Sequence, residues 1–149
     1  MSDAKQKIKK LTPLWRMKKR ELDLATMELK IMEQELTKLN IDLNKIQGLY
    51  LQKAEELNDR RSMIDRHGIA ICELEVDYYK ANWVKIFKDK IQCEQRLAAK
   101  RIEVIKIDAK TQTIDKLIGK HRKEHLIFLD KKEQEFLDEI SARMHYLNK

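Results

Sequence analysis

The fold of this chain is decided by residues 22–57, LDLATMELKIMEQELTKLNIDLNKIQGLYLQKAEEL. Apolar side chains recur in this stretch at alternating steps of three and four residues, and after Lys53 interrupts the run it resumes at Leu57. The other members of this ladder are Leu22, Ala25, Leu29, Met32, Leu36, Leu39, Leu43, Ile46 and Tyr50. Such spacing keeps one apolar seam facing a partner helix in a left-handed coiled coil. Because a thin helical rod has little room for a pocket, we expect a binding protein and not an enzyme.

The composition agrees with a helical rod. Charged residues make up 38% of the 149 residues, and only 3 Gly and 1 Pro are present, which leaves room for few turns. A hydrophobic content of 42% argues against disorder. No apolar run approaches the roughly 18 residues of a membrane span, and no signal peptide is evident. We therefore expect a cytoplasmic protein without a transmembrane segment.

The first helix is predicted to begin at Thr12-Pro13. Thr can cap the first amides of a helix, and Pro at the first helical position loses no hydrogen bond. A kink in a helix that begins nearer Ile8 is the alternative.

The first helix is predicted to end at Arg66-His67-Gly68. Cationic side chains suit the last turn of a helix, and Gly adopts the left-handed conformation that closes one. The sequence thus predicts a first helix over about 13–66, a turn at about 67–69 and a second helix over about 70–148.

One turn between two long helices predicts an all-α fold, a single-domain antiparallel coiled-coil hairpin over residues 1–149 with the second helix longer than the first. With the bend centred near residue 68, opposing positions have numbers that sum to about 135, which places Tyr50 opposite the stretch from Lys85 to Phe87. The apolar positions expected on the second helix are Leu74, Tyr79, Trp83, Phe87, Ile91, Ala98, Ile105, Ala109, Leu117 and His121. We expect such a hairpin to be monomeric when free.

About the last 25 residues of the second helix have no counterpart in the first helix of such a hairpin. They are nevertheless amphipathic, with apolar residues at Leu129, Phe136, Leu137, Ile140, Met144 and Leu147. An uncovered apolar stripe marks a binding surface, and a folded-back or dimerised tail is the alternative.

The net charge of +7 is unevenly distributed. Residues 1–20 contain eight cationic side chains against Asp3 alone, and the hairpin places Lys116, Lys120, Arg122 and Lys123 near them. Nucleic acid and an anionic membrane are possible partners of a basic surface, but acids are interleaved over the rest of the chain and no nucleic-acid reading motif is present. We expect a protein partner with an acidic lining.

The sequence contains no grouping that suggests catalysis. The three glycines are isolated, so no phosphate-binding loop is present. His121 and His125 share a helix face, but no third metal ligand is evident. Cys72 and Cys93 are expected to serve as small apolar residues and not to form a disulfide. We predict no catalytic residue, no cofactor and no metal.

The run KEQEFLDEISAR at residues 132–143, preceded by RKE at residues 122–124, resembles the signature that closes the FliJ family of flagellar export proteins. The opening stretch from Leu11 to Tyr50 is similar to the first helix of that family. The segment from Tyr79 to Ile91 resembles its aromatic-and-leucine stretch.

The resemblance implies a non-catalytic stalk of a flagellar type III protein export apparatus. Such a stalk inserts the end that bears its termini into a hexameric export ATPase and promotes the activity of that ATPase. It also contacts the cytoplasmic domain of the export gate and escorts export chaperones. The implied location is the cytoplasm, peripherally associated with the inner-membrane export apparatus.

The resemblance also implies two sets of binding residues. The candidates for binding the export gate are Tyr50, Trp83 and Phe87, whereas Lys90 and Glu94 depart from the family's pattern. The candidates for binding the ATPase are Lys18, Lys19, Arg20, Gln134, Leu137, Asp138, Ile140 and Arg143.

Three other functions are consistent with the residues alone. The chain could be a generic coiled-coil adaptor, scaffold or homodimer, or a basic helical protein that binds nucleic acid. It could also be the equivalent stalk of a virulence type III secretion system, although the C-terminal run favours the flagellar system.

Overall fold

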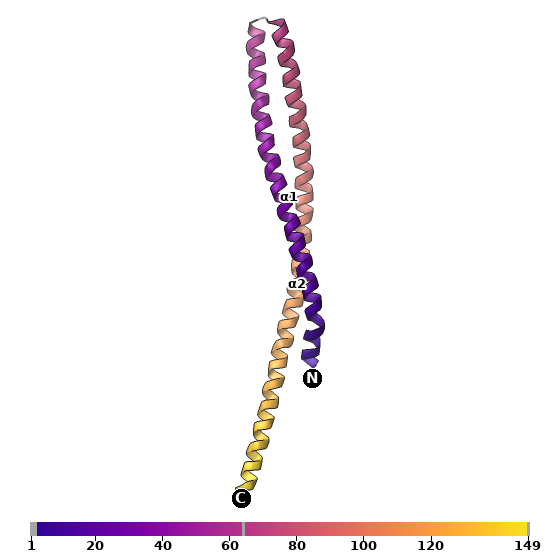
Figure 1. Ribbon diagram of the computed structural model, residues 1–149, viewed down its shortest axis with the longest axis vertical. Coiled ribbons are helices and arrows are strands. Elements are labelled where there is room, and N and C mark those ends of the chain that lie inside the picture. The colour runs from indigo at the N-terminus through magenta and orange to yellow at the C-terminus, as the bar shows by residue number, and fades with distance from the viewer. Residues whose placement is uncertain (1–2, 64, 149) are drawn as a thin grey trace. The chain divides into compact units, whose positions relative to one another are not determined.

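A computed structural model describes residues 3–63 and 65–148 of the chain. Two helices, α1 (Asp3–Ser62) and α2 (Arg66–Leu147), account for nearly all of these residues, which include no strand. The fold is an all-α antiparallel hairpin, and α2, with 82 residues, is longer than α1, with 60 (Figure 1). The predicted fold class is confirmed.

The helices form two compact units, which we describe separately. Unit 1 joins Met1–Leu24 to Val104–Lys149, and unit 2 consists of Ala25–Glu103. The single-domain organisation expected from the sequence stays a prediction. Neither helix contains, within its described residues, an apolar stretch of the length that crossing a bilayer requires.

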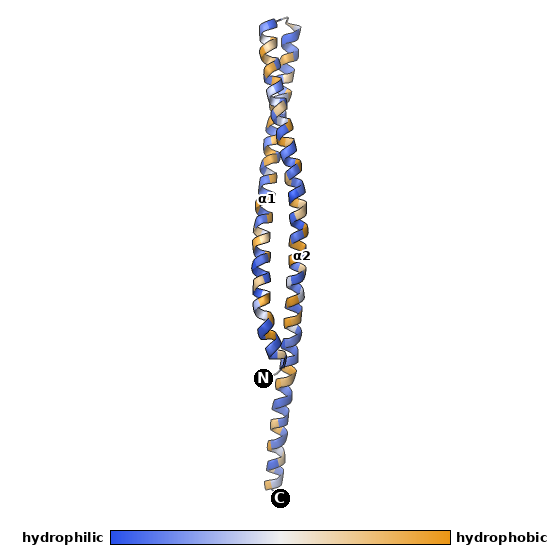
Figure 2. Cartoon of the chain, turned by 90° about the vertical axis from the view of Figure 1, so that its right-hand side faces the viewer, coloured by the Kyte–Doolittle hydropathy of each residue, from blue (hydrophilic) through white to orange (hydrophobic). Residues whose placement is uncertain are grey.

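In unit 2 the heptad ladder of α1 faces α2. Every predicted ladder position from Ala25 to Leu57 is buried or half-buried, Lys53 included, which confirms the predicted seam of α1. The facing positions on α2 also follow steps of three and four, and they are Cys72, Val76, Tyr79, Trp83, Ile86, Lys90, Cys93, Leu97 and Lys100. Hydrophobic and hydrophilic residues alternate along both helices, as expected for amphipathic helices (Figure 2).

In unit 1 each helix again has a ladder with steps of three and four residues. The ladder positions on α1, all buried or half-buried, are Ala4, Ile8, Leu11, Trp15, Lys18 and Leu22. Those on α2 are Val104, Ile107, Thr111, Ile114, Ile118, His121 and His125. The hydroxyl of Thr111, a buried residue, donates to the carbonyl of Ile107 at 2.8 Å, so this polar group is satisfied inside the seam.

The seam predicted for α2 was mostly wrong. Tyr79, Trp83 and His121 are half-buried, but the other predicted members are exposed, with Leu74 at 72% and Ile105 at 67%. The other exposed members are Phe87, Ile91, Ala98, Ala109 and Leu117. The error arose because Lys90, Lys100 and Thr111 occupy seam positions while several apolar residues lie outside. A prediction from hydrophobicity alone therefore chooses the wrong face of α2 as the one that packs against α1.

The predicted start of the first helix at residue 13 was also wrong. Helix α1 begins at Asp3, and Pro13 lies inside it. The hydroxyl of Thr12 donates to the carbonyl of Ile8 at 2.8 Å, so Thr12 bonds to the preceding turn of a helix that is already formed. Burial of Ala4 and Ile8 in the seam of unit 1 offsets the hydrogen bond that Pro13 cannot donate.

Helix α1 ends at Ser62 and α2 begins at Arg66, so residues 67–69, where the turn was predicted, lie inside α2. Asp65 sets this boundary, because its Oδ1 accepts the Gly68 amide at 3.1 Å, as an N-cap residue does, and its carbonyl accepts the Ile69 amide at 2.8 Å. Gly68 therefore lies in the first turn of α2. A Cβ at Gly68 would collide with the side chains of Asp65 and Arg60, so glycine allows this cap to pack closely.

The position of the turn fixes the pairing register in unit 2. Lys53 pairs with Glu75 at 2.9 Å, and Lys100 pairs with Glu28. Both pairs are symmetric about position 64. The pairing register predicted from a bend near residue 68 was therefore wrong, because the pairs are centred on position 64.

Candidate interaction surfaces

The three predicted gate-binding residues lie together in unit 2, and we call them the aromatic patch. Tyr50 of α1 and Trp83 of α2 line one hollow of about 150 Å³. The Trp83 ring stacks on Phe87, with centroids 5.6 Å apart and planes 17° apart. The remaining residues that line the hollow are Gln47, Leu51 and Lys80.

Tyr50 meets Lys80 and Trp83 in this hollow and not the predicted stretch from Lys85 to Phe87, because the turn comes earlier than expected. Phe87 is 41% exposed, and the Nε1 of Trp83 is buried without an acceptor among the described residues. Pockets for small molecules have volumes of about 300–1,000 Å³. A hollow of this size instead suits one apolar side chain of a protein partner.

Lys90 and Glu94, where the chain departs from the family's pattern, lie on α2 about one and two turns beyond Phe87. Their side chains approach each other at 3.9 Å. The stem of Lys90 is half-buried in the seam, so this residue takes part in the packing of the hairpin.

The basic candidates for ATPase binding differ in how exposed their charges are. The ammonium of Lys18, a seam residue, lies 3.2 Å from Glu21, and that of Lys19 lies 3.6 Å from Asp23. Arg20 is exposed, and no ion pair involves it among residues 3–63 and 65–148. Arg20 is thus the most accessible positive charge of the three.

The remaining ATPase candidates lie in the C-terminal overhang, which we define as residues 126–147 of α2. All its residues are exposed except Ile140, which is half-buried. Leu137 is 49% exposed and Arg143 is also accessible. Gln134 donates to Asp138 at 3.2 Å along the helix, so these two side chains are partly engaged with each other.

Two seam lysines form clamps between the helices of unit 2, and sequence reasoning missed both. The Lys53 ammonium contacts Glu75 at 2.9 Å and Glu56 at 3.2 Å. Hydrogen bonds with Glu75 and then Glu56 raise the pKa of Lys53 well above its ordinary value.

The second clamp repeats this arrangement at the other end of unit 2. Lys100 pairs with Glu28 across the helices and with Glu103 at 3.2 Å along its own helix, and the hydrogen bond with Glu28 is the main cause of its raised pKa. The signal for both clamps was present in the sequence, because each lysine is followed three residues later by a glutamate.

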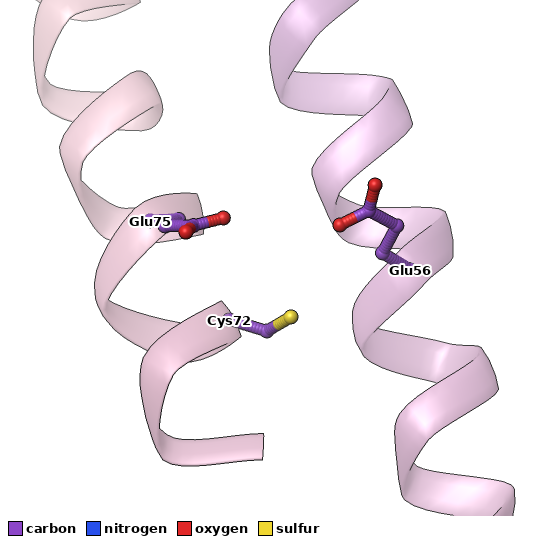
Figure 3. Close-up of side chains that lie close together, drawn as sticks. All are labelled: Glu56, Cys72 and Glu75. Carbon is purple, nitrogen blue, oxygen red and sulfur yellow. The ribbon is translucent and has the colours of Figure 1, made fainter. Parts of the chain in front are cut away.

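One clamp also gathers groups that could ligate a metal. The donor atoms of Glu56, Cys72 and Glu75 lie within 4.8 Å of one another and come from both helices (Figure 3). The Lys53 ammonium already lies against both carboxylates, however, so a cation occupies this position. The arrangement is explained as an ion-pair clamp beside a buried thiol, and the expected lack of a metal stays a prediction.

Two histidines of unit 1 lie in the seam. His121 and His125 are both half-buried, and the Nδ1 of His121 lies 3.1 Å from Glu124. This hydrogen bond is the main reason that the pKa of Glu124 lies below its ordinary value, and the charges of Lys120 and Lys7 act in the same direction. The contribution of Lys7 agrees with α1 beginning beside this part of α2.

Comparison with known proteins supports the family resemblance. A family model described as "Flagellar FliJ protein" matches residues 6–149. No curated protein and no solved structure matches the chain. The match includes both helices, the aromatic patch and the overhang, which is nearly the full length. The chain therefore belongs to the FliJ family of flagellar proteins.

Proposed function

We propose that this protein is a non-catalytic stalk that docks into the hexameric ATPase of a flagellar type III export apparatus and promotes its activity. Membership of the FliJ family supports a role in flagellar type III export and contact with components of that apparatus.

The observation that carries the proposal is the exposed apolar stripe of the overhang. Phe136 and Met144 are each 61% exposed, and Leu137 is 49% exposed. An amphipathic helix with an uncovered apolar stripe is a common ligand for a hydrophobic groove or pore. The overhang is therefore the segment that we expect to enter the ring of the ATPase.

The positive charge of unit 1 also supports docking of the ATPase at the end of the hairpin that bears the termini. The paired part of unit 1 is rich in cations, and Arg20 is exposed without an ion pair in the described part of the chain. A basic surface is attracted to an acidic ring lining, and this attraction increases the rate of association.

The aromatic patch is proposed to contact the cytoplasmic domain of the export gate. Its hollow of about 150 Å³ suits an apolar side chain of that domain, and Phe87 adds exposed aromatic area beside it. Aromatic residues are enriched where protein interfaces bind most strongly. Contact with export chaperones, a monomeric free state and a cytoplasmic location at the inner-membrane apparatus complete the proposal.

The test is the hydrolysis rate of the cognate export ATPase with and without this protein. We expect stimulation, and we expect Leu137→Asp/Ile140→Asp to abolish it while helicity by circular dichroism stays nearly intact. Leu74→Asp is the matched control, because Leu74 is an exposed apolar residue of the same helix outside the overhang.

Stimulation that survives the double substitution would exclude the overhang as the docking segment. An active, hexamer-forming ATPase that does not respond to the wild-type protein would instead favour a generic adaptor role. A large loss of helix in the double variant would show that the overhang is packed and not free.

A further inference from the structure

The overhang carries a heptad ladder that is distinct from the hairpin seam. Its apolar positions again follow steps of three and four, interrupted by Glu133 and Arg143, and they are Leu126, Leu129, Phe136, Ile140 and Leu147. If the heptad positions of the hairpin seam are extended along α2 past Phe128, they fall on Lys132, Glu135 and Glu139, which are charged and exposed. The apolar stripe therefore lies on another face of α2 and calls for a different partner helix.

We propose that the overhangs of two copies of this chain pair with each other as an antiparallel coiled coil, which gives a weak homodimer at protein concentrations above those at which the free hairpin is monomeric. In such a pair the positions of one copy lie opposite different positions of the other. In the register that places Leu129 opposite Ile140, Glu133 lies opposite Phe136 and Leu126 lies opposite Arg143. Each contact then occurs twice, as a two-fold axis requires.

Charge complementarity selects this antiparallel arrangement. Lys132 and Glu139 flank the stripe on the same side and lie seven residues apart. Antiparallel pairing brings Lys132 of one copy beside Glu139 of the other, whereas parallel pairing places Lys132 beside Leu137. Neither charge has an ion-pair partner among the described residues, and the Lys132 ammonium lies 5.0 Å from the centroid of the Phe128 ring.

Glu133 limits the strength of this dimer. It lies within the stripe, and a charged residue at a seam position lowers stability while it fixes the register. Dimerisation is therefore expected only at high protein concentration. It would cover Leu137 and Ile140, so the dimer and the ATPase complex would exclude each other, although the inference does not depend on that complex.

The test is sedimentation of the full chain alone over a wide range of concentration. We expect the mass to rise from 17.9 kDa toward twice that value as concentration increases. Lys132→Glu and Glu139→Lys each place like charges in contact twice and should each raise the half-association concentration about tenfold. The combined variant Lys132→Glu/Glu139→Lys should restore the wild-type value.

Lys131→Glu is the matched control, because it changes the net charge equally but lies on the face away from the stripe, and it should leave association unchanged. Circular dichroism of each variant checks that the helices are retained. The inference is overturned if the wild type stays at 17.9 kDa throughout, if the combined variant is not rescued, or if Lys131→Glu weakens association as much as Lys132→Glu. No ATPase is present, so the result is independent of the proposed export function.

Discussion

Ile105 and Ile107 provide a direct test of the seam of α2, because they are the same residue type two positions apart in one helix. Ile107 is 8% exposed and lies in the seam of unit 1, whereas Ile105 is 67% exposed. The seam positions predicted from the sequence included Ile105 and not Ile107. Replacing each by alanine should therefore have very different effects on stability.

The expected difference follows from burial. Ile107→Ala removes three buried carbon atoms, which costs about 2 kcal/mol at roughly 0.8 kcal/mol per methylene, and the cavity left behind raises the loss to about 2–4 kcal/mol. Ile105→Ala loses only about a third of that burial, and it gains about 0.4 kcal/mol of helix propensity. Its net effect should stay within about 0.5 kcal/mol.

Urea unfolding followed by circular dichroism at the helix band measures both free energies of unfolding. The m-value should be the same in the two variants, because neither substitution changes the surface exposed on unfolding by much. If Ile105→Ala costs as much as Ile107→Ala, or more, then the seam assigned to α2 is wrong.

Three further predictions concern the seam of α1, one clamp and the glycines. Leu43→Asp places a charge in the seam and should unfold most of the helix, and circular dichroism that retains full helicity would contradict it. The pKa of Lys53 is raised in the folded state, so its clamp contributes fully below the unfolded pKa of about 10.4 and is lost as pH rises further. The melting temperature should therefore fall more steeply above that pH in the wild type than in Lys53→Met. If the melting temperatures of the two proteins fall in parallel, the clamp does not contribute to stability. Gly48→Ala should stabilise the protein by about 1 kcal/mol, because a Cβ there meets no atom within 4 Å. Gly68→Ala should show no such gain, because the new Cβ displaces the Asp65 cap, and equal stabilisation of the two variants would argue against that cap.

The seam of α1 could be predicted because almost every one of its heptad positions is apolar. The seam of α2 could not be predicted from hydrophobicity, because Lys90 and Lys100 bury their stems there and place their charges at the edge. Ile91 and Ile105, which lie outside that seam, were predicted to be in it because they are apolar. The pairing of each seam lysine with acidic side chains explains why charged residues are tolerated at these positions.

The turn and the candidate sites show the same limits. Gly68 suggested a helix end, but the hydrogen bond from its own amide to Asp65 makes it part of a helix start, and a sequence does not distinguish these two uses of glycine. The neighbourhood of Tyr50 and Trp83 could be expected from the family resemblance. The presence of Lys80 in the same hollow could not, because it depends on a register that the turn sets.

The two lysine clamps have a mechanical consequence within unit 2. One lies near the turn and the other at the far end of unit 2, and each joins α1 to α2 through an ammonium held by carboxylates of both helices. Sliding one helix along the other by a single heptad would separate both cross-helix contacts at the same time. A tensile or compressive load along α2 is therefore shared with α1 at two points, and high salt, which screens exposed ion pairs, should make this part of the protein more compliant in shear.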